Sequence, residues 1–119
     1  MRVFAAIAAV FMLLPAAADT APLAAFDVGA YADLVSRPNP EGHSIVFVPS
    51  LVSVLLAAEQ GSGAALGEAE VLSLCDRAGA MAVPAESARK LEDGRGYKDL
   101  DPDRCWQEWQ EQRQELINP

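Results

Sequence analysis

The sequence is poor in the residues from which most metal and nucleophile sites are built. Its 119 residues include one histidine, His43, and two cysteines, Cys75 and Cys105. A single histidine cannot supply a histidine-rich metal site, and the HExxH, CxxC and GxSxG spacings do not occur. We therefore predict no metal and no cofactor, and the sequence offers no set of catalytic residues that can be named.

Carboxylates are the exception, because the chain has 17 aspartates and glutamates. Carboxylate catalysis needs two of them held together in a cleft, whereas these are scattered over predicted helix starts and polar faces. Asp99, Asp101 and Asp103 have the alternate spacing that opens a calcium loop, but Pro102 lies among them and Arg104 stands where the sharp turn needs glycine. Helix capping explains these aspartates better.

Basic residues are also scarce. Nine lysines and arginines against 17 acidic residues give a net charge of −8. A surface this negative repels nucleic-acid phosphates and anionic lipid headgroups. We therefore expect no nucleic-acid partner.

No apolar run of the mature chain reaches the ~20 residues that span a bilayer. The longest, residues 45–58, is interrupted by Pro49. Its first part, Ile45–Val48, is β-branched or aromatic and precedes a proline, which favours an extended backbone. After the proline, Leu51, Val54, Leu55 and Ala58 recur at helical spacing, and glycines follow at 61 and 63. This stretch predicts a core helix and no stable membrane span.

The first 18 residues have the pattern of a secretory signal peptide. One cation at Arg2 precedes an apolar region from 3 to 14, then Pro15 and small residues at Ala16 and Ala18. The alternative is an uncleaved N-terminal anchor, for which the apolar region is short. Cleavage after Ala18 predicts a periplasmic or secreted protein.

We expect residues 19–25 to be a mobile tail and residues 26–119 to be one small domain. Helical patterns cover 26–35, 51–60, 68–78, 84–93 and 101–117, and most are followed by a glycine. The predicted fold is all-α, a small four- or five-helix bundle of two helical hairpins packed face to face. Two short extended pieces, Ile45–Val48 and Met81–Val83, are allowed to pair beside it.

The cysteines predict a disulfide. Cys75 and Cys105 both lie on apolar helix faces, and export places them in an oxidising compartment. The alternative is a pair of buried free thiols.

The stretch before the last helix mixes basic and aromatic residues. Arg95, Tyr97, Lys98 and Arg104 stand close to Trp106 and Trp109, and tyrosine, tryptophan and arginine are the residue types enriched at interface hot spots. We interpret the first four as an interaction surface. In the alternative, the tryptophans belong to the core and Tyr97 covers them.

Small size, export and missing catalytic motifs together favour a non-catalytic domain that binds or modulates another exported protein. Two alternatives stay open. A helical bundle that binds a small molecule or lipid would need a cavity lined by Phe47, Leu51, Leu55 and Trp109. A carboxylate-dependent hydrolase would need two carboxylates in one cleft.

Overall fold

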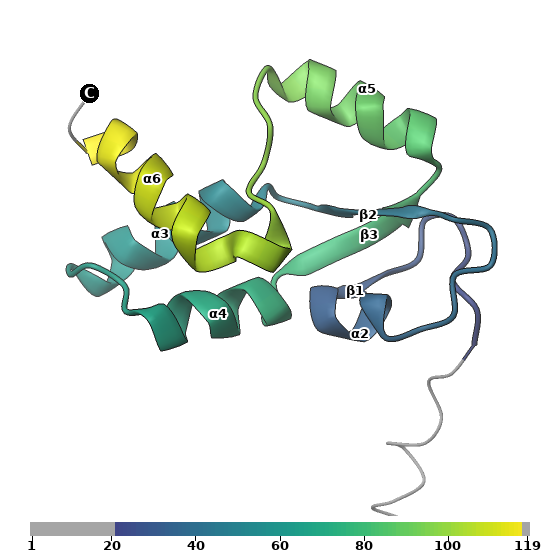
Figure 1. Ribbon diagram of the computed structural model, residues 1–119, viewed down its shortest axis with the longest axis horizontal. Coiled ribbons are helices and arrows are strands. Elements are labelled where there is room, and N and C mark those ends of the chain that lie inside the picture. Colours follow the sequence, from purple (N-terminus) through teal and green to yellow (C-terminus); the bar gives the residue numbers. More distant parts are fainter. Residues whose placement is uncertain (1–20, 118–119) are drawn as a thin grey trace, which may run out of the picture.

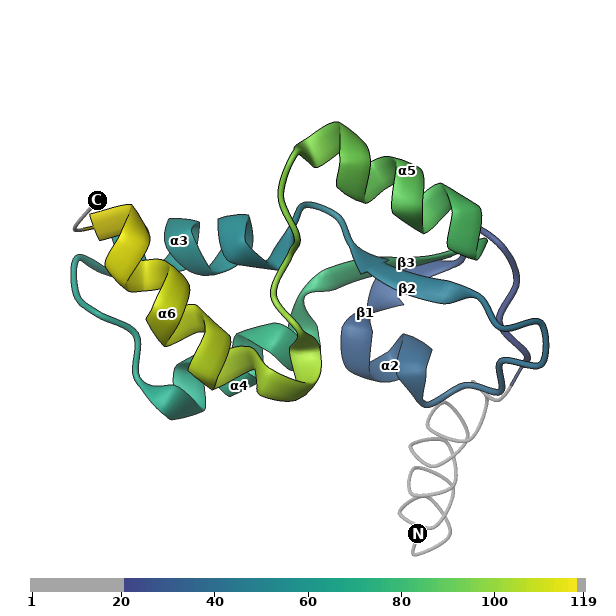
Figure 2. The same cartoon turned by 45° about the horizontal axis from the view of Figure 1, so that its top comes forward.

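The computed structural model describes residues 21–117, so the predicted signal peptide lies outside the described residues. The described chain contains a three-stranded antiparallel sheet as well as helices (Figures 1 and 2). The prediction of an all-α bundle is therefore wrong, and the fold is mixed α/β. In chain order the elements are β1 (Val28–Ala30), α2 (Tyr31–Val35), β2 (Ser44–Phe47), α3 (Leu51–Ser62), α4 (Glu68–Arg77), β3 (Gly79–Val83), α5 (Ala85–Arg95), the 3-10 helix η1 (Pro102–Arg104) and α6 (Cys105–Ile117).

The sheet has the order β1-β3-β2. β2 overlaps the predicted extended piece Ile45–Val48 at residues 45–47, β3 contains Met81–Val83, and the two strands pair antiparallel with Phe47 opposite Ala80. The unexpected strand is β1, which lies inside the predicted helix 26–35 and pairs with β3, Gly29 opposite Ala80. Because Gly29 weakens a helix there, pairing with β3 satisfies its backbone groups instead, and the helix begins only at Tyr31.

The central apolar stretch is divided between a strand and a helix. After β2, α3 begins at Leu51 and ends at Ser62, where Gly63 takes the left-handed conformation with φ 74°. Leu51 and Leu55 are completely buried, as their spacing predicts. Among the helices of residues 21–117, none is both long and apolar enough to cross a membrane.

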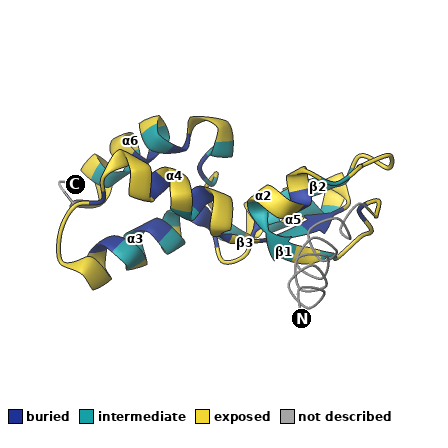
Figure 3. Cartoon of the chain, turned by 90° about the horizontal axis from the view of Figure 1, so that it is seen from below, coloured by how far each residue is buried: buried dark blue, intermediate teal, exposed yellow. Residues whose placement is uncertain are grey.

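The helices α3 and α4 form a hairpin inserted between the neighbouring strands β2 and β3, and α6 packs against both helices (Figure 1). Their shared core contains Leu55, Val71 and Trp109, each with no exposed surface. The predicted second hairpin is not formed. α5 lies beside β2, apart from α6 (Figure 1), and none of its residues is buried, whereas α3 and α4 carry buried residues (Figure 3).

A disulfide joins Cys75, in α4, to Cys105, the first residue of α6. Their Cα atoms are 6.8 Å apart, and both residues are buried. The predicted pairing is confirmed. A buried disulfide is compatible with an oxidising compartment.

The described part of the expected tail, residues 21–25, is packed against the domain. Leu23 is 2% exposed and donates its N–H to the carbonyl of Pro38 at 2.8 Å. The Arg37 guanidinium donates to the carbonyls of Ala21 and Pro22 and to the Asp27 carboxylate. The N–H of Ala24 and the charge of Arg37 hold the pKa of Asp27 below its usual value. This segment is thus anchored to the domain through Arg37.

The two faces of the sheet differ. α2 covers one face, where Tyr31 stacks on Phe47 with ring centroids 4.9 Å apart. On the other face Val28, Met81 and Val46 lie in one cross-strand row, and Val28 is 72% exposed. The sheet therefore buries one face and leaves much of the other accessible.

Candidate functional site

A groove runs along the edge of β2 that faces away from β3. In Figure 1, β2 lies between β3 and α5, and the segment after α5 descends past the end of β2. The cavity between these three elements has a volume of about 470 Å³. Ile45, Phe47, Ala88, Leu91 and Leu100 are among its apolar lining residues. We call this cavity the β2–α5 groove.

The backbone of β2 alternates in the direction its polar groups point. Val48 donates its N–H to the carbonyl of Gly79 at 3.0 Å, which fixes the parity of the antiparallel ladder. Residues 44, 46 and 48 therefore bond to β3. Ile45 and Phe47 point their N–H and C=O groups away from β3 and toward the groove.

Some of these outward groups already have partners. At the start of the strand, the Asn39 side chain bonds both the N–H and the carbonyl of His43, at 2.9 and 2.8 Å. At the other end, Nη2 of Arg95 donates to the Phe47 carbonyl at 2.6 Å. Within residues 21–117, no partner contacts the N–H of Ile45, its carbonyl or the N–H of Phe47. Such an edge is a template for pairing with another chain.

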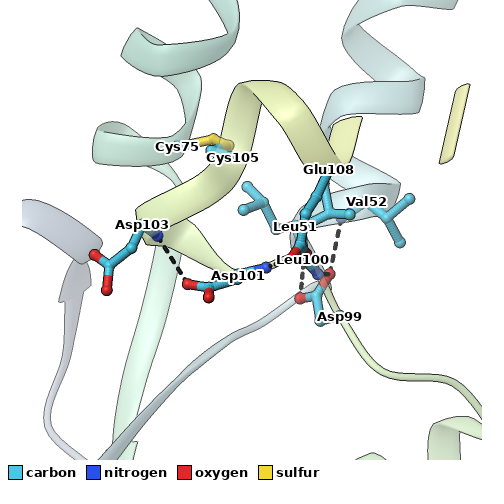
Figure 4. Close-up of a disulfide and its surroundings, with 9 residues drawn as sticks. All are labelled: Leu51, Val52, Cys75, Asp99, Leu100, Asp101, Asp103, Cys105 and Glu108. Atoms are coloured by element: carbon cyan, nitrogen blue, oxygen red, sulfur yellow. Dashed lines mark hydrogen bonds between the residues drawn. A yellow bond between two sulfur atoms is a disulfide. The ribbon is translucent and has the colours of Figure 1, made fainter. Parts of the chain in front are cut away.

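Asp99, which lines the groove, is hydrogen-bonded to the start of α3 (Figure 4). Its carboxylate accepts the N–H groups of Leu51 at 2.6 Å, Val52 at 3.0 Å and Leu100 at 2.9 Å. The first two belong to the N-terminus of α3, whose own N-cap residue Ser50 makes no capping bond. Asp99 thus caps α3 from a distant part of the chain and fastens the segment after α5 to that helix.

Arg95 closes the same end of the groove. Its side chain is 17% exposed, and Nη1 lies 3.7 Å from Oδ2 of Asp99. It is the last residue of α5, because Gly96 follows with a φ of 77°. Arg95 therefore connects three elements: the last turn of α5, the end of β2 and the cap of α3.

The structure brings together three of the four predicted interaction residues. Arg95, Tyr97 and Lys98 all line the groove. The hydroxyl of Tyr97 shares a hydrogen bond of 2.8 Å with the hydroxyl of Ser50. Arg104 does not line the groove: it lies on η1, with Nη1 3.6 Å from Oε2 of Glu108.

Two of the three carboxylates that line the groove, those of Asp99 and Asp101, are engaged in the fold. Asp99 caps α3, and Asp101 accepts the N–H of Asp103 at 2.9 Å as the N-cap of η1, with Pro102 next, as the sequence predicts. In residues 21–117 there is no cluster of three metal-ligating side chains. Asp99 and Asp101 therefore act as structural acceptors, and the third carboxylate of the lining is that of Glu92 in α5.

The residues named for a small-molecule cavity do not lie around one space. Phe47 lines the groove, whereas Leu51 and Leu55 have no exposed surface in the core. Trp109 lines a separate cavity of about 280 Å³ between residues 65–66 and α6. The packing thus divides the set between core and surface.

Comparison of the chain with known protein families, with curated proteins and with solved structures gives no match. The site therefore rests on its own geometry. Sequence reasoning found Arg95, Tyr97 and Lys98 from composition but missed the backbone of Ile45 and Phe47. Their only sequence signal is the β-branched and aromatic run before the proline, which does not tell an edge strand from a central one.

Proposed function

We propose that the protein is a small, exported, non-catalytic binding domain that takes an extended segment of another protein along β2. The observation that carries the proposal is the unpaired edge of β2 inside the groove. Ile45 offers one N–H and one carbonyl there, and Phe47 offers one N–H. An added strand satisfies all three groups through its own backbone.

The size of the site fits a short segment. A strand advances about 3.3 Å per residue, so the free groups of Ile45 and Phe47 are matched by three or four residues of a partner. The cavity of about 470 Å³ lies within the usual range of binding sites. Ala88 and Leu91 of α5 line the groove opposite β2 and offer apolar contact to the side chains of the segment.

Most of the binding free energy must come from contacts of the bound segment's side chains. Three backbone hydrogen bonds contribute roughly 0.5–1.5 kcal/mol each, whereas a micromolar complex needs about 8 kcal/mol. Apolar side chains packed against α5 must supply much of the difference. We therefore expect sequence-selective binding of micromolar strength.

The location we propose is the periplasm or the exterior. The disulfide and the pattern of residues 1–18 support it. The intact mass of the protein from an exported fraction is expected to correspond to a chain that starts at Asp19. Recovery of the full-length chain from the cytosol would contradict this.

Binding is tested with two displayed libraries of short random peptides, one with free C-termini and one with both ends fused. Selected peptides are measured against the wild-type protein and against Ile45→Pro. Proline removes an N–H that the fold does not use and leaves a carbonyl of the bound segment without its donor, so binding is expected to fall about tenfold (about 1.4 kcal/mol). Ile45→Val keeps the N–H and is the matched control.

A second variant guards against misfolding of Ile45→Pro. Ala88→Phe fills the groove from α5 and leaves every residue of the sheet unchanged, and Asp93→Phe adds the same bulk at an exposed position of α5 that does not line the groove. Loss of binding only in Ala88→Phe supports the site. If neither library gives a binder, or if binders bind Ile45→Pro and Ala88→Phe as they bind the wild type, strand addition at β2 is excluded.

A further inference from the structure

We infer that the groove receives the free carboxyl terminus of its partner, with the last residue beside Phe47 and its carboxylate against Arg95. This inference rests on the proposed strand addition and specifies its direction and its end. It follows from which backbone groups of β2 are free and which single one is blocked.

The blocked group is the carbonyl of Phe47. Nη2 of Arg95 already donates to it at 2.6 Å, so a partner N–H would have to use the remaining lone pair beside a positively charged guanidinium. Pairing of the added strand is therefore disfavoured at the Phe47 carbonyl. The free groups before that point are the N–H and carbonyl of Ile45 and the N–H of Phe47.

An antiparallel segment fits the free backbone groups of Ile45 and Phe47 poorly. One of its residues pairs with both groups of Ile45, and the residue two positions earlier gives its carbonyl to Phe47 N–H. The N–H of that earlier residue then faces the blocked carbonyl and the guanidinium of Arg95. It loses its acceptor beside a positive charge, which is unfavourable.

A parallel segment satisfies all the free groups of Ile45 and Phe47 if its chain ends beside Phe47. In the slanted parallel pattern, one residue gives its N–H to the carbonyl of Ile45 and an oxygen to the N–H of Phe47. When this residue is the last, that oxygen belongs to its carboxylate. The second oxygen then lies toward Arg95, and no N–H is left without an acceptor.

The charges at this end suit an anion. Arg95 is a partly buried guanidinium that lines the groove and uses one donor nitrogen on Phe47 and another near Asp99, so donors remain. Asp99, the nearest carboxylate, has its oxygens directed at three backbone N–H groups. Lys98 adds a second cation to the lining. The lining of the groove has three basic residues, Arg89, Arg95 and Lys98, and three acidic ones, Glu92, Asp99 and Asp101, of which the last two already accept backbone N–H groups.

The decisive probe is a synthetic peptide chosen from the libraries above, prepared as the free acid and as the C-terminal amide. The acid is expected to bind at least about tenfold more tightly, because amidation removes a charge-assisted hydrogen bond. Binders are also expected to come mainly from the library with free C-termini. Extension of the peptide by one glycine is expected to weaken it as amidation does.

Variants locate the effect. In Arg95→Gln the ratio of acid to amide affinity is expected to fall toward one, even if both affinities change. Lys90→Gln removes an exposed cation of α5 that does not line the groove, and the ratio is expected to stay as in the wild type. Acid and amide that bind the wild type within twofold of each other, with loss of binding in Ile45→Pro, would overturn the carboxylate inference and leave strand addition standing.

Discussion

The cap that Asp99 provides to α3 gives a sharp test of the fold. Asp99→Ala removes the acceptor of three backbone N–H groups at once. The N–H of Leu51 is the most affected, because that residue has no exposed surface where water can replace the carboxylate. The same substitution takes away the carboxylate that lies 3.7 Å from Arg95.

The expected magnitude follows from these contacts. Leaving one buried donor unsatisfied costs about 1–3 kcal/mol, and loss of a helix cap costs about 0.5–2 kcal/mol. Because the N–H of Val52, a residue that is only partly buried, recovers a bond to water, we expect a total loss of about 2–4 kcal/mol. For a domain of this size the total stability is roughly 5–15 kcal/mol, and each kcal/mol shifts the Tm by about 4–8 °C.

The assay is urea unfolding followed by far-ultraviolet circular dichroism, with the disulfide intact. Asp99→Asn keeps one oxygen acceptor and is expected to lose about half as much stability as Asp99→Ala. Asp93→Ala is the control, because Asp93 is exposed in the last turns of α5 and removal of a negative charge there is neutral or slightly favourable. If Asp99→Ala and Asp93→Ala agree within about 0.5 kcal/mol, the capping argument is wrong.

Three further predictions concern the core, the disulfide and acid stability. Trp109→Ala is expected to lower the free energy of unfolding by about 3–5 kcal/mol, because the Trp109 side chain is completely buried. Trp106 is only partly buried, so Trp106→Ala is expected to lower it by less. Equal losses in urea unfolding would contradict the packing. The denatured exported protein is expected to have no thiol that reacts with an alkylating reagent before reduction, and two after reduction. Two reactive thiols before reduction would disprove the bond. Replacement of both Cys75 and Cys105 by alanine is expected to lower the free energy of unfolding by about 3–4 kcal/mol. The pKa of Asp27 is lowered in the folded state, so the stability that its carboxylate contributes is present above the unfolded pKa near 4 and is lost as the pH falls through the lower folded pKa. Asp27→Asn is expected to reduce this loss of stability in acid, measured by unfolding curves at several pH values. An unchanged pH profile would show that the ion pair of Asp27 with Arg37 does not stabilise the fold.

Local patterns predicted several helix boundaries. The spacing of Leu51 and Leu55 placed them on the buried face of α3, and Gly63 ends that helix as its position suggested. α4 likewise ends before Gly79. α5 was expected to stop before Gly94 but continues to Arg95, because the left-handed residue that ends it is Gly96.

The sheet was the main failure. Helical spacing over residues 26–35 is short and contains Gly29, so local preference there is weak and pairing with β3 decides the outcome. Once β1 and β2 flank β3, the chain has no second helical hairpin, and α5 is left beside an edge strand. A pattern of side chains does not reveal which strand lies at an edge.

The sequence by itself determined where α3 and α4 lie along the chain, which helix faces are apolar, and that Cys75 and Cys105 lie on such faces. These features depend on contacts within one or two turns, so the order of residues is enough to fix them. Only the tertiary structure decided that Asp99 caps a helix that begins 48 residues earlier and that Arg95 reaches the end of β2. Those contacts depend on strand register and helix packing, which bring distant segments together and leave Ile45 and Phe47 facing an open groove.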